Sequence, residues 1–426
     1  MRQTFGKRAS LCHTSMKINK HCFPNGLRLV HYEDTSTQMV ALNIVYDVGA
    51  RDEHPEHTGF AHLFEHLMFG GSAHIPDYDT PLQLAGGENN AWTNNDITNY
   101  YLTVPKPNVE TAFWLESDRM LELAFSEQSL EVQRGVVMEE FKQRCLNQPY
   151  GDVGHLFRPL AFRVHPYRWP TIGKELSHIE QATLDEVKSF FYRFYAPNNA
   201  VLAVTGNISW DETVKLTEKW FAPIPRRDVP VRQLPQEPEQ TQERRLTVER
   251  NVPLDALFMG YHMCSREGAD YYAFDILSDI LSNGRSSRLN RRLVQEQNIF
   301  SGIDAYISGT RDAGLLQISG KPAAGVSLEQ AEAAVRKELE ELQRSPVDGQ
   351  ELEKVKNKFE STQIFGNINY LNVATNLAGF ELTGKAEDID LEVERYRSVT
   401  TEQLHTVAQR TFCESNAVVL YYKSDK

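Results

Sequence analysis

The chain has 426 residues, of which 41% are hydrophobic, so it is long enough to form two or more folded domains. Its formal net charge of −13 argues against a nucleic-acid partner, because phosphates demand a basic surface. The negative charge is compatible with the attraction of basic peptides, and it is equally explained by solubility alone. No apolar run approaches the roughly 20 residues that span a bilayer, so we expect no membrane span.

The N-terminus and the cysteines bear on the compartment. Residues 1–16 are basic, rich in hydroxyl groups and free of acids, which is weakly similar to an organelle transit peptide; a true start at Met16 explains them equally well. Five scattered cysteines with no C-x-x-C pair indicate neither a disulfide framework nor a thiolate metal site. We therefore expect a reducing compartment, the cytoplasm, with an organelle matrix as the alternative.

The first half of the chain is predicted to mix strands and helices. Alternating or continuous apolar residues predict strands, and a period of 3.6 predicts helices. The expected strands are residues 27–32, 39–46, 91–93, 97–104 and 200–205, and the expected helices lie within residues 57–69, 108–124, 130–144 and 184–195.

The helix within residues 57–69 carries the chemistry. His62 and His66 are four residues apart and share one helix face, with Glu65 on an adjoining line of that face. Neutral imidazoles and a carboxylate are standard zinc ligands, and a catalytic zinc needs three protein ligands plus one open position. The alternative is a core helix whose histidines are satisfied by hydrogen bonds. If zinc binds, Glu65 lies off the common line of the histidines and can reach a zinc-held water as the general base, so the third ligand must come from elsewhere.

The second half repeats the order of the first. Strands are expected at residues 256–261 and 312–321, and helices at residues 271–281, 327–344 and 350–363. A stretch rich in Pro, Gln and Glu, residues 223–244, reads as a linker. The order predicts an internal duplication, with one domain over residues 1–222 and a second over residues 245–426.

The duplication provides an internal control for the metal motif. When the halves are laid side by side, the positions of the two histidines and the glutamate are taken in the second half by Phe274, Leu277 and Ser278. The fold therefore does not require the three polar residues. Their presence in the first half indicates a chemical role.

Three blocks of the sequence resemble the M16 family of zinc peptidases, which includes pitrilysin and the mitochondrial processing peptidase. They are the inverted H-x-x-E-H motif at residues 62–66, Asn90-Ala91-Trp92-Thr93, and residues 133–140, Gln-Arg-Gly-Val-Val-Met-Glu-Glu. The resemblance implies an α+β fold in which two similar domains, each an antiparallel-rich sheet covered by helices, face each other as a clamshell.

The resemblance also implies the remaining site residues. The family places its third zinc ligand at the last position of the third block, which is Glu140 here, with Glu139 as the competitor. One zinc per chain is then held by His62, His66 and Glu140. Where many members carry an auxiliary glutamate, this chain has Gln133, which leaves the ligands intact but puts efficiency and zinc affinity in doubt.

Substrate binding follows from the same resemblance. Asn90, Ala91, Trp92 and Thr93 match the family's N-A-x-T strand, whose exposed edge pairs with an extended peptide, and backbone pairing is indifferent to sequence. Asn90 either touches the scissile peptide or only shapes the turn. The implied activity is that of an endopeptidase acting on unstructured peptides.

The partner is inferred from what the second half lacks. Catalytically complete members carry an Arg and a Tyr in a segment that corresponds to residues 293–301, and neither residue stands at its place here. The chain therefore resembles the zinc-bearing subunit of a two-subunit peptidase, paired with a paralogue that bears Arg and Tyr or with a second copy of itself. The alternative is a structural M16-like subunit without activity.

Overall fold

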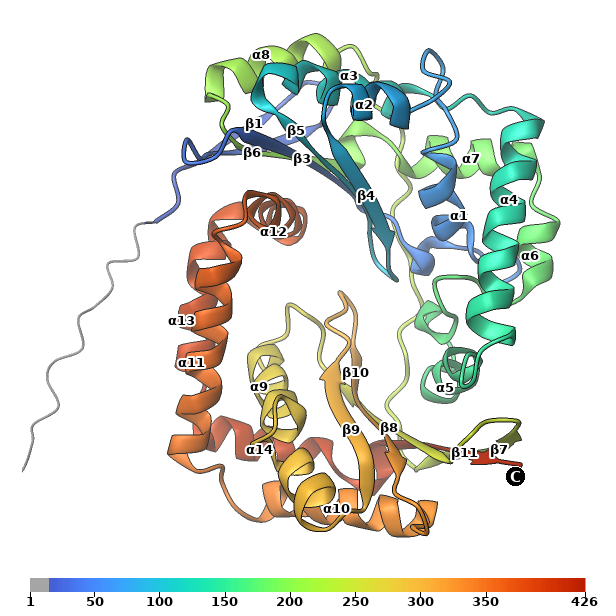
Figure 1. Cartoon of the computed structure of the whole chain (residues 1–426), viewed down its shortest axis with the longest axis vertical. Helices are drawn as coiled ribbons and strands as arrows, with labels where there is room; N and C mark the ends of the chain where they lie inside the picture. The colour runs from blue at the N-terminus through green and yellow to red at the C-terminus, as the bar shows by residue number, and fades with distance from the viewer. Residues whose placement is uncertain (1–14, 426) are drawn as a thin grey trace, which may run out of the picture.

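A computed structural model of the protein describes residues 15–425, in which two β-sheets with their covering helices face each other (Figure 1). The basic N-terminal stretch lies outside the described residues, except for Ser15 and Met16. The clamshell of two α+β units that the resemblance implied is confirmed.

The first sheet has six strands in the order β1-β2-β6-β3-β5-β4. Their bounds are β1 Ile18–Cys22, β2 Arg28–Glu33, β3 Met39–Tyr46, β4 Glu88–Thr93, β5 Thr98–Pro105 and β6 Ala200–Gly206. β2 and β6 run parallel, and the other neighbours run antiparallel. β4 is therefore an edge strand.

The second sheet repeats this arrangement with five strands in the order β7-β11-β8-β10-β9. The strands are β7 Arg244–Arg250, β8 Ala256–Met263, β9 Phe300–Ile307, β10 Gly314–Pro322 and β11 Ala417–Ser424. β7 and β11 are parallel, as β2 and β6 are, and the others are antiparallel. All five strands match β2 to β6 in order and direction, and among the described strands β1 alone has no counterpart. The predicted duplication is confirmed.

Helices cover the outer face of each sheet. The helices that the structure places before the linker are α1 Phe60–Leu67, α2 Asp79–Leu84, α3 Val109–Leu121, α4 Glu127–Phe141, α5 Val153–Ala161, α6 Leu176–Glu180, α7 Leu184–Phe194 and α8 Trp210–Trp220. Those after it are α9 Tyr271–Ser282, α10 Leu328–Arg344, α11 Gly349–Gly366, α12 Tyr370–Thr383, α13 Glu392–Ser398 and α14 Thr401–Thr411. None of the described helices combines the length and apolarity needed to cross a bilayer.

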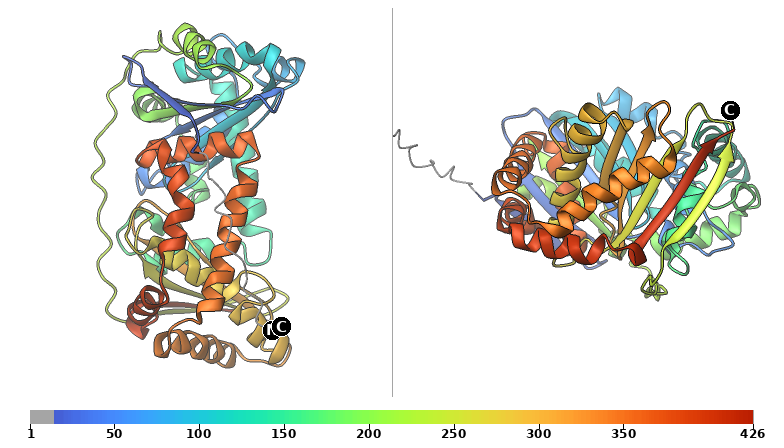
Figure 2. Two further views of the ribbon diagram at one scale, coloured as in Figure 1. Left: turned by 90° about the vertical axis from the view of Figure 1, so that its left-hand side faces the viewer. Right: turned by 90° about the horizontal axis from the view of Figure 1, so that it is seen from below.

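One helix of each half also packs against the sheet of the other half. α12 lies across the inner face of the first sheet (Figures 1 and 2), where its buried residue Leu377 joins a core cluster with Val30, Ala41 and Val201. In return, Phe157 of α5 packs with Leu315, Val418 and Leu420 of the second sheet. The inner faces of both sheets are thus buried in part, which explains the continuous apolar runs of β3 and β6.

The linker between the sheets has neither helix nor strand from residue 225 to residue 243, and it runs along one side of the molecule (Figure 2). β7 begins at Arg244, the residue at which the predicted linker ends. The division of the chain at residues 222 and 245 stays a prediction, since each sheet is covered in part by a helix from beyond that division.

Candidate metal centre

α1 is an apolar helix buried on most sides. Its core side is made by Phe60, Ala61, Leu63, Phe64 and Leu67. His62 and His66 lie on the remaining side, where α4 packs alongside α1 (Figure 1). The packing of α4 brings Glu140 over the two imidazoles, so three residues from two helices meet at one place.

The distances within this group fit a zinc ion. Nε2 of His62 is 3.6 Å from Oε1 of Glu140, and Nε2 of His66 is 3.3 Å from Oε2 of Glu140. The potential ligand atoms all lie within 4.8 Å of one another. Ligands at about 2.0–2.1 Å from a tetrahedral zinc are about 3.3 Å apart, so only small adjustments separate this arrangement from a three-ligand site. No second such group occurs in residues 15–425.

The protonation states of the group also suit a cation. Burial lowers the pKa of His62 to about 4, with Glu140 opposing the change, so this imidazole is neutral near pH 7. A hydrogen bond with His66 is the main cause that lowers the pKa of Glu140 below its usual range. A neutral imidazole and an ionised carboxylate are the forms that bind zinc.

Glu65 stands beside the group without joining it. Burial raises its pKa, and the hydroxyl of Thr93 is the main opposing influence. A carboxyl group whose pKa moves toward neutrality is better able both to accept and to return a proton. Thr93 belongs to β4, and α1, which carries Glu65, contacts that edge strand.

The outer edge of β4 is unpaired in the part of the chain that the structure describes. Asn90 is exposed, and Ala91, Trp92 and Thr93 are half-buried. The side-chain oxygen of Asn90 accepts a hydrogen bond of 2.8 Å from the N–H of Ala91. A peptide that adds to this edge would compete with Asn90 for that N–H.

One charged neighbour of the centre was not foreseen from the sequence. Nη1 of Arg144 lies 2.9 Å from Oε1 of Glu140, and the Arg144 side chain is 68% exposed. It projects from the π-helical turn Lys142–Leu146 that follows α4. Its spacing of four residues from Glu140 on one helix is the signal that could have revealed the pair.

Two other segments named by the resemblance are also placed. Gln133 lies on α4 near Gly70, just beyond the end of α1. In the second half, Leu293 and Phe300 are buried in the core, whereas Val294 is half-buried and Ser301 is exposed. Phe274, Leu277 and Ser278 are buried in α9, the counterpart of α1.

Family models match two long stretches of the chain. The model described as insulinase, peptidase family M16, matches residues 28–152, and the one described as peptidase M16 inactive domain matches residues 181–359. The chain belongs to the M16 peptidase family. The first M16 stretch contains His62, Glu65, His66 and Glu140.

M16 relatives of similar length carry protease names. The zinc protease PqqE of Helicobacter pylori is 26% identical to this chain over 420 residues. The match covers 96% of this chain and 94% of PqqE. YmxG of Bacillus subtilis, named an uncharacterized zinc protease, is 25% identical over 406 residues, 95% of this chain and 98% of its own.

Solved M16 structures share the fold. The crystal structure of a protease from Helicobacter pylori has a TM-score of 0.92 at 25% identity and covers 96% of this chain and 100% of its own. The periplasmic protease PqqL of Escherichia coli has a TM-score of 0.78 at 19% identity, and the match covers 95% of this chain but 47% of PqqL. The fold of this chain thus corresponds to about half of PqqL.

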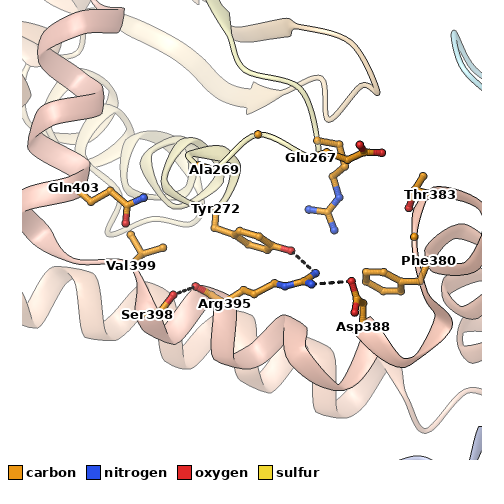
Figure 3. A pocket seen from close by; sticks show the side chains of 13 residues that line it. Glu267, Ala269, Tyr272, Phe380, Thr383, Asp388, Arg395, Ser398, Val399 and Gln403 are labelled. Carbon is orange, nitrogen blue, oxygen red and sulfur yellow. Dashed lines mark hydrogen bonds and ion pairs between the residues drawn. The ribbon is translucent and has the colours of Figure 1, made fainter.

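A cavity of about 510 Å³ lies away from these M16 site residues (Figure 3). It is lined by Tyr272 of α9, Phe380 of α12 and the ion pair between Arg395 and Asp388, 2.7 Å apart. Arg395 there is bonded to Asp388 and to the hydroxyl of Tyr272, and the group of possible metal ligands lies instead on α1 and α4.

Proposed function

We propose that this chain is a zinc-dependent endopeptidase that hydrolyses unstructured peptides. The observation that carries the proposal is the convergence of two imidazoles and a carboxylate, from α1 and α4, next to Glu65 and to the unpaired edge of β4. Membership of the M16 family and relatives named as zinc proteases support it.

The residues divide the work as follows. His62, His66 and Glu140 would hold one zinc ion per chain. A bound zinc ion lowers the pKa of a water molecule to about 7 and polarises a carbonyl group. Glu65 accepts the proton as water attacks the scissile carbonyl, and it then donates that proton to the leaving amine. The C–N bond breaks, and a carboxylate and an amine are released.

The substrate is expected to bind as an added strand. Ala91 and the residues beside it present backbone groups along the edge of β4, and an extended peptide can pair with them whatever its sequence. A folded protein offers no free strand of this kind, so the proposal specifies unstructured peptides. Asn90 and Trp92 flank Ala91 and would contact alternate side chains of the peptide.

We further propose that the active form is a dimer, with a paralogue or with a second copy of the chain. The chain has no Arg/Tyr pair at residues 293–301, where the resemblance requires one to stabilise the developing negative charge. A partner could provide it. PqqL, about half of which corresponds to this chain, supports a pairing of two such units.

The alternative function is a structural subunit without catalysis. A solved relative from Pseudomonas fluorescens, titled an M16 inactive domain, shares the fold with a TM-score of 0.87 at 16% identity. Gln133 in place of the auxiliary glutamate also fits this alternative.

The deciding experiment measures zinc and cleavage together. The purified chain, alone and mixed with its candidate paralogue, is analysed for zinc and then assayed with an unfolded, mildly basic peptide before and after removal of metal. About one zinc per chain and metal-dependent cleavage support the peptidase. A chain that binds no zinc and cleaves nothing in either state is a structural subunit.

A further inference from the structure

Three consecutive residues connect the junction of the two halves to the metal helix. Arg51, Asp52 and Glu53 follow β3 in a single helical turn that begins at Ala50. Arg51 is 5% exposed and Glu53 is 7% exposed, so both polar side chains are buried and need partners within the protein. Burial raises the pKa of Glu53 to about 8.

Glu53 caps α1 from a distance in the sequence. Its Oε2 accepts the N–H of Gly59 at 3.0 Å, and its Oε1 accepts the N–H of Ala61 at 2.9 Å. The first N–H groups of a helix have no partner within the helix, and the two oxygens of Glu53 accept two of them. Glu53 therefore fixes the start of the helix that bears His62, Glu65 and His66.

A local cap cannot replace Glu53. The N-cap residue of α1 is Gly59, which has φ +89° and no side chain. A Cβ atom at Gly59 would lie 2.7 Å from Cδ1 of Ile179 and 2.9 Å from the carbonyl oxygen of Ile172. The residues that usually cap helices, Ser, Thr, Asp and Asn, are thus excluded by space as well as by backbone conformation.

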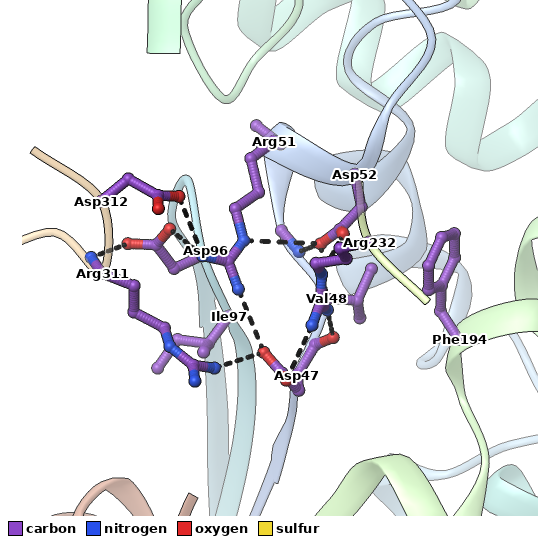
Figure 4. A network of polar contacts seen from close by, with 12 residues as sticks. Asp47, Val48, Arg51, Asp52, Asp96, Ile97, Phe194, Arg232, Arg311 and Asp312 are labelled. Atoms are coloured by element: carbon purple, nitrogen blue, oxygen red, sulfur yellow. Dashed lines mark hydrogen bonds and ion pairs between the residues drawn. The ribbon is translucent and has the colours of Figure 1, made fainter. Parts of the chain in front are cut away.

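Arg51 reaches from the same turn to the second half. Its guanidinium lies 3.3 Å from Asp47 and 3.1 Å from Asp96 in the first half, and 3.4 Å from Asp312 in the loop before β10 (Figure 4). Asp312 and Arg311 are the residues of the second half that enter this cluster, where Arg311 pairs with Asp47 at 2.7 Å.

The linker joins the cluster as well. Arg232 pairs with Asp52 and, at 2.8 Å, with Asp47 (Figure 4). The three residues of the turn thus have three different attachments: Arg51 to the second half, Asp52 to the linker and Glu53 to α1. Hydrogen bonds within the turn, from the N–H of Asp52 to the carbonyl oxygen of Gly49 and from the N–H of Glu53 to that of Ala50, hold these residues together. A displacement at Arg51 is therefore expected to reach Glu53.

We propose that Glu53 is a positioning residue of the metal centre and that Arg51, through Asp312, ties it to the second half. The inference rests on the proposed function, because it assigns a role toward the metal that α1 and α4 would hold. Its consequence is that the affinity of the centre for metal depends on the contact between the halves.

The first test titrates Co²⁺ into the metal-free, full-length protein and follows the visible absorption of tetrahedral Co²⁺. Glu53→Gln keeps the size but loses one acceptor. Outer-shell changes typically cost about 10–100-fold in metal affinity, so we expect a loss of this size and an altered spectrum. The control is Glu332→Gln, since the buried Glu332 carboxylate of α10 in the second half accepts hydrogen bonds from Arg245, Arg336 and Tyr421 and contacts none of residues 51–53. The control should bind Co²⁺ within about twofold of the wild type, as the effects of distant sites are independent.

The second test weakens the ion pair between Arg51 and Asp312, which is one of several contacts between the halves. Asp312→Asn should weaken Co²⁺ binding by at least about twofold. Glu387→Gln is its control, because Glu387 of the second half pairs with Lys20 of the first half at 2.8 Å without touching residues 51–53. Equal Co²⁺ affinity in Asp312→Asn and Glu387→Gln would overturn the link.

The outcomes separate this inference from the proposed function. A wild-type chain that binds no Co²⁺ refutes the metal centre itself. A wild-type chain that binds Co²⁺, together with a Glu53→Gln variant that binds equally well, overturns the positioning role alone. If Glu53→Gln does not fold, as judged by its thermal unfolding beside that of Glu332→Gln, the Asp312→Asn titration decides.

Discussion

His62, His66 and Glu140 supply every protein donor of the proposed zinc site, so none of them is redundant. Replacing any one by Ala should reduce the zinc content from about one per chain to nearly none and abolish peptidase activity. Elemental analysis of the purified variants checks this. Glu139→Ala is the matched control, because Glu139 is the neighbouring acid on α4 and its side chain is 57% exposed. Full zinc in His66→Ala would contradict the assignment, and loss of zinc in Glu139→Ala would move the third ligand.

Glu65 is proposed to transfer a proton and not to bind metal. Glu65→Gln should keep the zinc and the thermal stability of the wild type, since shape and hydrogen bonding are retained. Turnover should fall by at least about 10²–10⁴, the usual contribution of a general acid-base group. The measurements are zinc content and kcat on one unfolded peptide. A variant that loses its zinc shows that Glu65 is a ligand.

The buried imidazole of His62 predicts a pH dependence of stability in the metal-free protein. Burial lowers its pKa from the ordinary 6.5 to about 4. Between these values the unfolded chain binds a proton that the folded chain does not, so this contribution to stability is present above pH 6.5 and is lost as the pH falls to 4. Thermal unfolding should therefore show a larger drop in Tm over this range for the wild type than for His62→Gln. Parallel curves for the two proteins would show that the pKa of His62 is the same in the folded and the unfolded chain.

At the scale of the element, α12 and α5 each stabilise the sheet of the opposite half of the chain. Leu377 of α12 is fully buried on the first sheet. Leu377→Ala should lower the free energy of unfolding by about 2–5 kcal/mol, the usual cost of such a cavity. Because the helix joins the two halves, denaturant unfolding should remain a single transition with a lower midpoint. Leu391→Ala, at a residue 42% exposed, is the control with little effect; two separate transitions in Leu377→Ala would contradict coupled halves.

The same elements show how far sequence reasoning reaches. α1, with His62 and His66 on one face and Glu65 beside them, was predictable because these residues lie within five positions and obey one helical period. The exchange of α5 and α12 was not predicted, because an apolar helix face does not say which sheet it will cover. Val201, which packs beside Leu377, stands more than a hundred residues away in the chain. Glu53 was missed for a similar reason, since its role depends on two backbone N–H groups that only the fold brings to it.

At the scale of the whole molecule, the missing Arg/Tyr pair predicts a weak peptidase that a partner completes. Removing one donor to a developing oxyanion typically costs about 10²–10³ in rate. We therefore expect that mixing this chain with a paralogue bearing Arg and Tyr raises the rate of peptide cleavage by about that factor. The assay compares this chain, the paralogue and the mixture on one mildly basic peptide. Full activity of this chain as a monomer would refute the two-subunit proposal.

The structure also selects the residues for restoring the pair within one chain. Leu293 and Phe300 belong to the core, whereas Val294 and Ser301 are less buried. Val294→Arg combined with Ser301→Tyr should therefore recover part of the activity without loss of stability. Leu293→Arg combined with Phe300→Tyr is the control, which we expect to be destabilised because it places a charge in the core.

The exchange of helices between the halves also restricts how the gene for such a protein can be divided or recombined. A gene cut at the linker would encode two products, each with a bare sheet face and each carrying a helix meant for the other. Neither product is expected to fold stably by itself. The gene segment that encodes both halves is therefore the smallest one that evolution can duplicate, fuse or delete as a unit. PqqL fits this expectation, because the stretch that corresponds to this chain includes both halves and still accounts for only 47% of PqqL. Recombination should therefore join or separate genes at the ends of the paired halves. We expect few breakpoints within the linker of residues 225–243, although it is the longest stretch without helix or strand between the two sheets.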